Sequence, residues 1–260
     1  MKQIINTKWF VFLILFSIIF THSLIGTIKA KEYVIGVEDV SYYPLYDFSA
    51  ELPNKASFTK ELLSTFFNTQ GYQFKFLPLP VKRFDKWYME EAIDFKFPDN
   101  IRWREGDSKE LNITYSEPVL RLMAGSFVLK KNKNIARKDI TRLGTIFGFF
   151  PTLWYDRVQD NSLELVEVSS PYSIVKHMLR GNLQATNIDK NVIDYNLKLL
   201  GHQDDEIVLN EGIKHEDYAY HFSSIHHPHI IKEFNLFLKN NKQLVASIKA
   251  KYKVNEVLPK

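Results

Sequence analysis

The stretch SFTKELLSTFFNTQGYQFKFLPLP, from Ser57 to Pro80, is the part of the sequence that says most about the fold. Its first part predicts a helix that begins after Ser57 and ends at Gly71, because apolar residues recur there at helical spacing. These residues are Phe58, Leu62, Leu63, Phe66 and Phe67. Its second part, residues 72–80, predicts a strand. A helix that leads directly into a strand is typical of α/β folds.

The segments on either side also alternate between predicted strands and helices. KEYVIGVEDV (31–40) alternates in polarity and is rich in β-branched residues, which predicts a first strand. VKRFDKWYMEEA (81–92) is expected to be a helix and IDFKFP (93–98) a third strand. This β-α-β-α-β order implies a parallel sheet with right-handed crossovers.

A second α/β set follows an extended segment at residues 115–131. The expected elements are strands at 144–150, 163–169, 183–189, 205–213 and 217–225, and helices at 152–160, 170–181, 190–201 and 228–252. No long linker separates the two sets, so we expect the chain to cross from one to the other and return. The predicted lobes are residues 31–118 with 214–260, and residues 119–213.

The first thirty residues have the pattern of a cleaved secretory signal. Lys2 and Lys8 precede the apolar run WFVFLILFSIIF (9–20), and a stretch ending at Ala30 follows. An uncleaved anchor is the alternative, but the run is shorter than the roughly 20 residues that span a bilayer. The chain has no cysteine, so it forms no disulfide and has no site for lipid attachment at an N-terminal cysteine. We therefore expect a periplasmic protein.

The charge and the motifs narrow the class of function. The formal net charge is +4, and removing residues 1–30 with their three lysines leaves +1, which does not suggest a nucleic-acid partner. No nucleophile elbow, H-E-x-x-H motif or phosphate-binding glycine loop is present. We expect a binding protein without catalytic residues, metal or cofactor.

Three stretches resemble one protein family. They are YVIGVEDVSYYPLY, with Pro44; ITYSEPVLRLMAGSFVLKKN; and the C-terminal DYAYHFSSIHHPHIIKEFNLFLKNNKQLVASIKAKYKV. In order and spacing they are similar to periplasmic solute-binding proteins of family 3, which deliver amino acids to ABC transporters. The resemblance implies an α/β, two-lobed type II binding-protein fold, with parallel-rich sheets flanked by helices. It also implies a monomer that captures an amino acid or related small polar solute for a membrane permease.

The chain departs from this family at ligand-related motifs. KASFTKELL stands where the family has G-F-x-x-D, and Gln184 stands where it has an aspartate. The T-x-x-R motif, whose arginine holds the ligand carboxylate, is missing, although Arg102 and Arg104 lie nearby. The resemblance therefore supports the fold more than amino-acid specificity.

Asp189 allows two interpretations. In the family an aspartate at this position pairs with the ligand ammonium, and ligands of open α/β sheets lie beyond the carboxyl ends of strands. Asp189 also precedes the predicted helix at 190–201, where it would serve as an N-cap. One role does not exclude the other.

Aromatic residues are the next candidates for ligand contacts. Tyr42, Tyr43 and Tyr46 follow the first strand, and Trp103 lies between two arginines. Such rings can stack on a planar ligand or a cation. The alternatives are that the tyrosines cover the core and that Trp103 lies on the surface.

Arg83 and Arg121 could hold a ligand carboxylate through two parallel hydrogen bonds. The alternative for each is a surface arginine, which is common. His226, His227 and His229 are too closely spaced for the usual metal pattern and instead indicate a helix that begins at Pro228.

Two other functions compete with solute delivery. One is a periplasmic sensor that passes closure to a separate membrane signalling protein, and the other is a hydrolase or lyase built on the same lobes. Turnover of a bound compound would separate the enzyme from the binding proteins.

We predict that the exported protein begins near Lys31 and is released by osmotic shock, because the apolar run is of signal-peptide length. N-terminal sequencing of the released protein tests this. A chain that retains Met1 in the membrane fraction would contradict it.

Overall fold

The computed structural model describes residues 31–49, 55–104 and 110–257, and from Glu32 onward the chain forms one compact unit. The predicted signal sequence, residues 1–30, lies outside the described residues. Within the described ranges, no helix is both long and apolar enough to cross a membrane.

The first sheet has six strands in the order β4-β1-β5-β13-β6, and β7 pairs with β13. The pairs β1–β4 and β1–β5 are parallel, while β13 runs antiparallel to β5, β6 and β7. The bounds are β1 Glu32–Glu38, β4 Gln73–Leu79, β5 Phe95–Asp99, β6 Thr114–Tyr115, β7 Leu120–Ala124 and β13 Glu216–Ser224. The parallel β-α-β-α-β arrangement predicted from residues 31–98 is confirmed.

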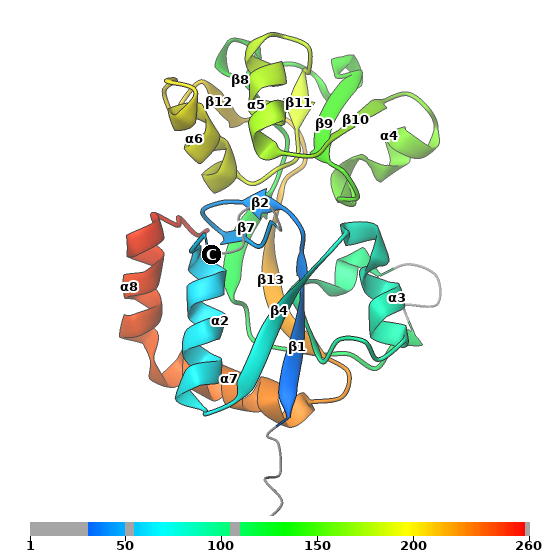
Figure 1. Cartoon of the computed structure of the whole chain (residues 1–260). Coiled ribbons are helices and arrows are strands. Elements are labelled where there is room, and N and C mark those ends of the chain that lie inside the picture. Colours follow the sequence, from blue (N-terminus) through cyan, green and yellow to red (C-terminus); the bar gives the residue numbers. More distant parts are fainter. Residues whose placement is uncertain (1–30, 50–54, 105–109, 258–260) are drawn as a thin grey trace, which may run out of the picture. The chain divides into compact units, whose positions relative to one another are not determined.

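Helices cover both faces of this sheet. Figure 1 shows α2, α7 and α8 on one side and α3 on the other. Their bounds are α2 Phe58–Thr69, α3 Phe84–Met89, α7 Pro228–Asn240 and α8 Lys242–Tyr252. Two short 3₁₀ helices, η1 (Val81–Arg83) and η2 (Ile101–Trp103), follow the carboxyl ends of β4 and β5.

The alternation of β1 explains this two-sided packing. Ile35 and Val37 are fully buried in the cluster that contains the apolar residues of α2, whereas Val34 packs against the cluster that contains Phe84 of α3. Successive side chains of a strand point to opposite faces, so an apolar strand requires cover on both.

The start of α2 differs in detail from the expectation. Ser57 is at the N-cap position, but its side chain makes no capping bond. Its Oγ instead accepts a hydrogen bond of 2.9 Å from the backbone N–H of Asp47. The helix end is as predicted, because Gly71 has a φ of +72° that disfavours other residues.

The second sheet has five strands in the order β10-β9-β11-β8-β12. The strand bounds are β8 Phe127–Leu129, β9 Arg142–Ile146, β10 Glu164–Val168, β11 Ala185–Thr186 and β12 Ile207–Leu209. The helices of this part are η4 Lys130–Asn132, η5 Arg137–Asp139, η6 Thr152–Trp154, α4 Tyr155–Gln159, α5 Pro171–Leu179 and α6 Lys190–Leu199. Trp154 is fully buried within this part, and its indole N–H donates to Ser126 Oγ at 3.0 Å.

Two predicted strands are shorter than expected. The strand expected at 144–150 ends at Ile146, because Gly148 turns the chain with a φ of +90°. A Cβ at Gly148 would lie 3.1 Å from Val81 Cβ, so a glycine suits both the turn and the close approach. The strand expected at 183–189 is reduced to β11. The predicted lobe limits, 31–118 with 214–260 and 119–213, stay a prediction.

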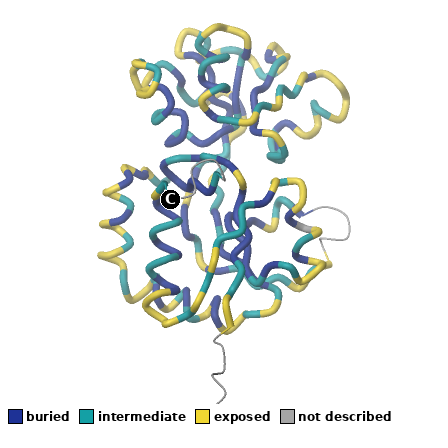
Figure 2. Tube along the Cα trace, viewed as in Figure 1, coloured by how far each residue is buried: buried dark blue, intermediate teal, exposed yellow. Residues whose placement is uncertain are grey.

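Buried residues concentrate along the strands and on parts of the helices, as Figure 2 shows. In α2, Phe66 is fully buried, and its ring centroid lies 5.0 Å from that of Phe234 and 5.5 Å from that of Phe237. The aromatic contact joins α2 to α7 and anchors the helical layer on one face of the first sheet.

Removing this ring should destabilise the fold. We predict that Phe66→Ala lowers the free energy of unfolding by about 3–5 kcal/mol, because it leaves a cavity among packed rings. The melting temperature should fall by roughly 6–20 °C for a chain of this size. Leu236→Ala, at an exposed position of α7, is the matched control and should change stability by less than about 0.5 kcal/mol. Equal melting temperatures for the two variants would contradict the packing described here.

Candidate functional site

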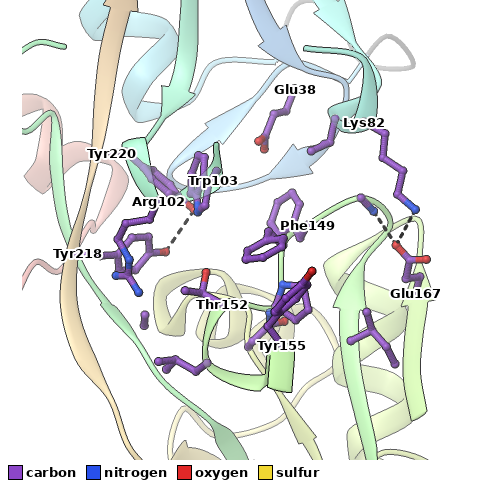
Figure 3. Close-up of a pocket in the computed structure, with 18 of the residues that line it drawn as sticks. Glu38, Lys82, Arg102, Trp103, Phe149, Thr152, Tyr155, Glu167, Tyr218 and Tyr220 are labelled. Atoms are coloured by element: carbon purple, nitrogen blue, oxygen red, sulfur yellow. Dashed lines mark hydrogen bonds and ion pairs between the residues drawn. The ribbon is translucent and has the colours of Figure 1, made fainter. Parts of the chain in front are cut away.

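A pocket of about 520 Å³ is lined by residues from both sheets and their loops. Figure 3 shows Glu38 and Trp103 on one side and Phe149, Thr152 and Tyr155 on the other. Its volume falls within the range of small-molecule sites, roughly 300–1,000 Å³.

The carboxyl ends of parallel strands build this pocket. Glu38 is the last residue of β1, and Lys82 and Arg102 lie in the 3₁₀ helices after β4 and β5. From the second sheet come the loop after β9, which carries Phe149, and Glu167 near the end of β10. Ligands of open α/β sheets bind at such edges.

Aromatic rings form much of the wall. They are Tyr42, Phe84, Trp103, Phe149, Phe150, Tyr155, Tyr218 and Tyr220. Several touch one another, with ring centroids 5.4 Å apart for Tyr42 and Phe149, and 5.6 Å apart for Trp103 and Tyr220. A pocket with such walls suits a ligand with a flat, apolar or cationic part.

Glu38 is a buried carboxyl in the lining of the pocket. Its side chain is buried, with 4% of the residue exposed, and the Tyr46 hydroxyl donates a hydrogen bond to Oε2. Burial raises the pKa of Glu38 to about 7, although Tyr46 and the charge of Lys96 act in the opposite direction. The folded-state pKa thus exceeds the unfolded value. This carboxyl therefore contributes stability below about pH 4.5 that is lost as the pH rises through about 7.

Each cationic side chain in the lining has a carboxylate partner. Lys82 Nζ lies 3.4 Å from Glu167 Oε1, and Lys96 Nζ lies 3.3 Å from Asp99 Oδ1. The Arg102 guanidinium donates to Glu216. The Lys82–Glu167 pair joins the side of the pocket formed by the first sheet to that formed by the second.

Two of the four aromatic candidates line the pocket, namely Tyr42 and Trp103. Tyr46 is fully buried behind Glu38, so it acts on the pocket through the hydrogen bond to that carboxyl. Tyr43 is not part of the lining. Its ring lies 4.3 Å from that of Tyr195, and Lys55 Nζ sits 4.8 Å from its centroid.

The two predicted arginines lie elsewhere. Arg83 is exposed at the end of η1 and is absent from the pocket lining. Arg121 is exposed on β7, where its backbone N–H donates to Glu256 and its carbonyl accepts from Val257 N–H. The structure therefore brings neither arginine to this pocket, and a ligand contact by either stays a prediction.

Asp189 occupies the N-cap of α6. Its Oδ1 accepts hydrogen bonds of 2.8 Å from both the backbone N–H and the side-chain amide of Asn191. Its backbone N–H donates to the Tyr42 hydroxyl at 2.7 Å, and burial raises its pKa to about 6. Asp189 lines a smaller pocket of about 190 Å³ and not the large one.

Several residues of the lining were not among the candidates predicted from the sequence. Glu38 could have been found as an acid at the carboxyl end of the first strand, and Tyr218 and Tyr220 as alternating residues on one face of β13. Phe149 could not, because it lay in a segment predicted to be strand. Lys96 lies within β5, and nothing in its surrounding sequence pointed to a site.

In the histidine cluster at residues 226–229, His227 contacts a carboxylate next to the start of α7. His227 Nε2 lies 2.8 Å from Asp94 Oδ1, and α7 begins at Pro228 as predicted. Among the described residues, no group of three or more potential ligands is arranged to hold a metal.

The chain can be compared with known proteins at the level of structure. No family model matches it, and no curated protein matches it by sequence. A histidine kinase sensor domain with similarity to periplasmic binding proteins has a TM-score of 0.69 at 13% identity, covering 89% of this chain and 99% of that chain.

Two further structures share the fold. An ABC uptake transporter substrate-binding protein from Streptococcus pneumoniae, with bound histidine, has a TM-score of 0.66 at 17% identity and covers 88% of this chain and 95% of its own. An ancestral amino-acid-binding protein, a precursor of cyclohexadienyl dehydratase, has a TM-score of 0.63 at 15% identity. The match covers 85% of this chain and 95% of that chain. The predicted α/β, two-lobed periplasmic binding-protein fold is thereby confirmed.

The contacts of Asp189 predict a capping role. Asp189→Asn should keep the cap, because asparagine caps about as well as aspartate, and should leave solute affinity within about threefold. Asp189→Ala should lose about 1 kcal/mol of stability. Melting temperature and solute affinity, measured on both variants, test this. A loss of affinity of thirty-fold or more in Asp189→Asn would instead assign the carboxylate to the ligand.

Proposed function

We propose that this chain is a periplasmic solute-binding protein that captures a small polar solute, an amino acid or a related compound, for the permease of an ABC transporter. The pocket carries the proposal, because its walls come from both sheets. A solute that contacts both walls favours the closed form, since only that form offers both sets of contacts.

Contacts across the pocket support closure as the working motion. Lys82 of η1 pairs with Glu167 of β10, and Glu167 Oε1 also accepts a hydrogen bond of 2.9 Å from Gly148 N–H. The Lys82 ammonium also lies 4.3 Å from the centroid of the Phe147 ring. The contacts of Lys82 with Glu167 and Phe147 would form on closure and break on opening, whereas the Gly148–Glu167 hydrogen bond lies within the part built on the second sheet and holds the carboxylate in place. A membrane partner could then recognise the closed form.

The ligand would be held chiefly by Tyr42 and Trp103 from the predicted set, together with Glu38, Phe149 and Tyr220. The export signal predicted at residues 1–30 would place the protein in the periplasm after cleavage, without a lipid anchor because the chain has no cysteine.

A sensor is the second candidate. The similarity to a histidine kinase sensor domain favours it, and the same closure could be read by a separate membrane signalling protein. Copies of the chain that co-purify with a permease support transport, and copies that co-purify with a kinase support sensing.

An enzyme on the same lobes is the third candidate, favoured by a buried carboxyl with a pKa of about 7 in the pocket. An enzyme would convert its ligand, whereas a binding protein returns it unchanged. Mass spectrometry of the solute after incubation separates the two.

A screen of amino acids, amines, peptides and organic acids should find a solute that raises the melting temperature. At one hundred times its dissociation constant a ligand adds about 2.7 kcal/mol, which corresponds to roughly 5–11 °C here. Trp103→Ala should reduce the shift, whereas Leu199→Ala, at an exposed position of α6, should not. A screen in which nothing shifts the melting temperature contradicts solute binding.

A further inference from the structure

Among the described residues, every cationic side chain of the pocket lining already contacts a protein carboxylate. Lys82, Lys96 and Arg102 are the cations of its lining, and each contacts a protein carboxylate. An incoming α-carboxylate would have to displace one of these partners. For the buried Lys96–Asp99 pair, displacement would leave a desolvated carboxylate without part of its counter-charge, which is unfavourable, whereas the Lys82–Glu167 and Arg102–Glu216 pairs are partly exposed.

The environment of the Glu38 carboxyl differs from that of these three cations. Among the described residues, Tyr46 is the hydrogen-bond donor to the Glu38 carboxyl, and a phenol hydroxyl carries no charge. The other ionisable groups that act on Glu38 are Lys96 and Asp99, and Tyr42, Tyr218 and Tyr220 also interact with it electrostatically. Lys96 Nζ lies 3.3 Å from Asp99 Oδ1, so the positive charge of Lys96 acts on Asp99 as well as on Glu38.

The surroundings of Glu38 favour a cation. In Figure 3 its carboxyl points into a space with Trp103 and Tyr220 on one side and Phe149 on the other. Aromatic faces attract organic cations. Asn187, which also lines the pocket, has a buried Oδ1 with no hydrogen-bond partner in the described part of the chain, so an acceptor is available for an N–H donor.

We propose that the pocket takes organic monocations, which are amines or ammonium groups on an aromatic or other apolar body without a carboxylate, and that Glu38 is their counter-charge. This inference rests on the solute-binding function proposed above. It narrows the solute class from amino acids to their carboxylate-free relatives.

Matched compounds test the class directly. Tyramine, phenethylamine and tryptamine would be compared by calorimetry with tyrosine, phenylalanine and tryptophan, which add only the carboxylate. The amines should bind at least tenfold more tightly. Amino acids that bind as well as the amines, or better, would overturn the inference and leave solute binding intact. If none of the six binds, the inference fails, and if the broader screen also finds nothing, solute binding fails with it.

Two substitutions test the roles of the charges. Glu38→Gln keeps the shape of the side chain, and its melting temperature without ligand checks that it folds. Its affinity for the best amine should fall at least thirty-fold, the effect of losing one desolvated charge pair. Glu216→Gln releases Arg102 and should instead improve binding of the matched amino acid. Unchanged amine affinity in Glu38→Gln would overturn the proposal.

The pH dependence adds a readout that a structural role would not move. The amine needs ionised Glu38, and the pKa of this carboxyl is about 7 in the free protein. Amine affinity should therefore rise about tenfold between pH 6 and pH 8 in the wild type, and stay flat in Glu38→Gln. An amine affinity that stays flat or falls over this range in the wild type would contradict the proposal.

Discussion

The parallel pairing of β1 between β4 and β5 is the constraint on which the rest depends. In this register Glu38 faces Leu79 and Ile35 faces Phe95, so the three strands end at one edge of the sheet. The segments that follow β1, β4 and β5 therefore leave the sheet at the same edge. The pocket exists at this edge because the apolar alternation of β1 demands helices on both faces and leaves the strand ends uncovered.

The buried charged groups at this edge determine which charged side chains of the pocket can contact a ligand. Asp99 is fully buried and receives the Arg104 guanidinium, the Ser223 hydroxyl at 2.5 Å and the Lys96 ammonium. Such a carboxylate is tolerated in a folded chain only when its partners satisfy it. Arg104 and Lys96 therefore have partners within the fold, and the acidic group that faces a solute in the pocket is the carboxyl of Glu38, which accepts a hydrogen bond from the uncharged Tyr46 hydroxyl.

The elements with strong periodicity could be predicted from the sequence, and the site only in part. The α2 stripe and the β1 alternation are local patterns, and both elements form as expected. Asp189 was recognised as a possible cap because capping is also local. An acid at the end of a predicted strand is a local signal that could have pointed to Glu38. That Glu38, Lys96 and Phe149 line one pocket depends on which strands become neighbours, which no window of sequence contains. Arg83 and Arg121 were predicted as ligand contacts from their residue type alone, and neither lines the pocket.

A crystal structure of the mature protein with its solute tests the central claim most directly, namely that residues from both sheets hold a ligand beside Glu38. The account predicts a solute in contact with Trp103 on one side and Phe149 on the other, with a cationic nitrogen at the Glu38 carboxyl. A solute bound instead in the smaller pocket at Asp189, or held by the first sheet alone, would contradict it.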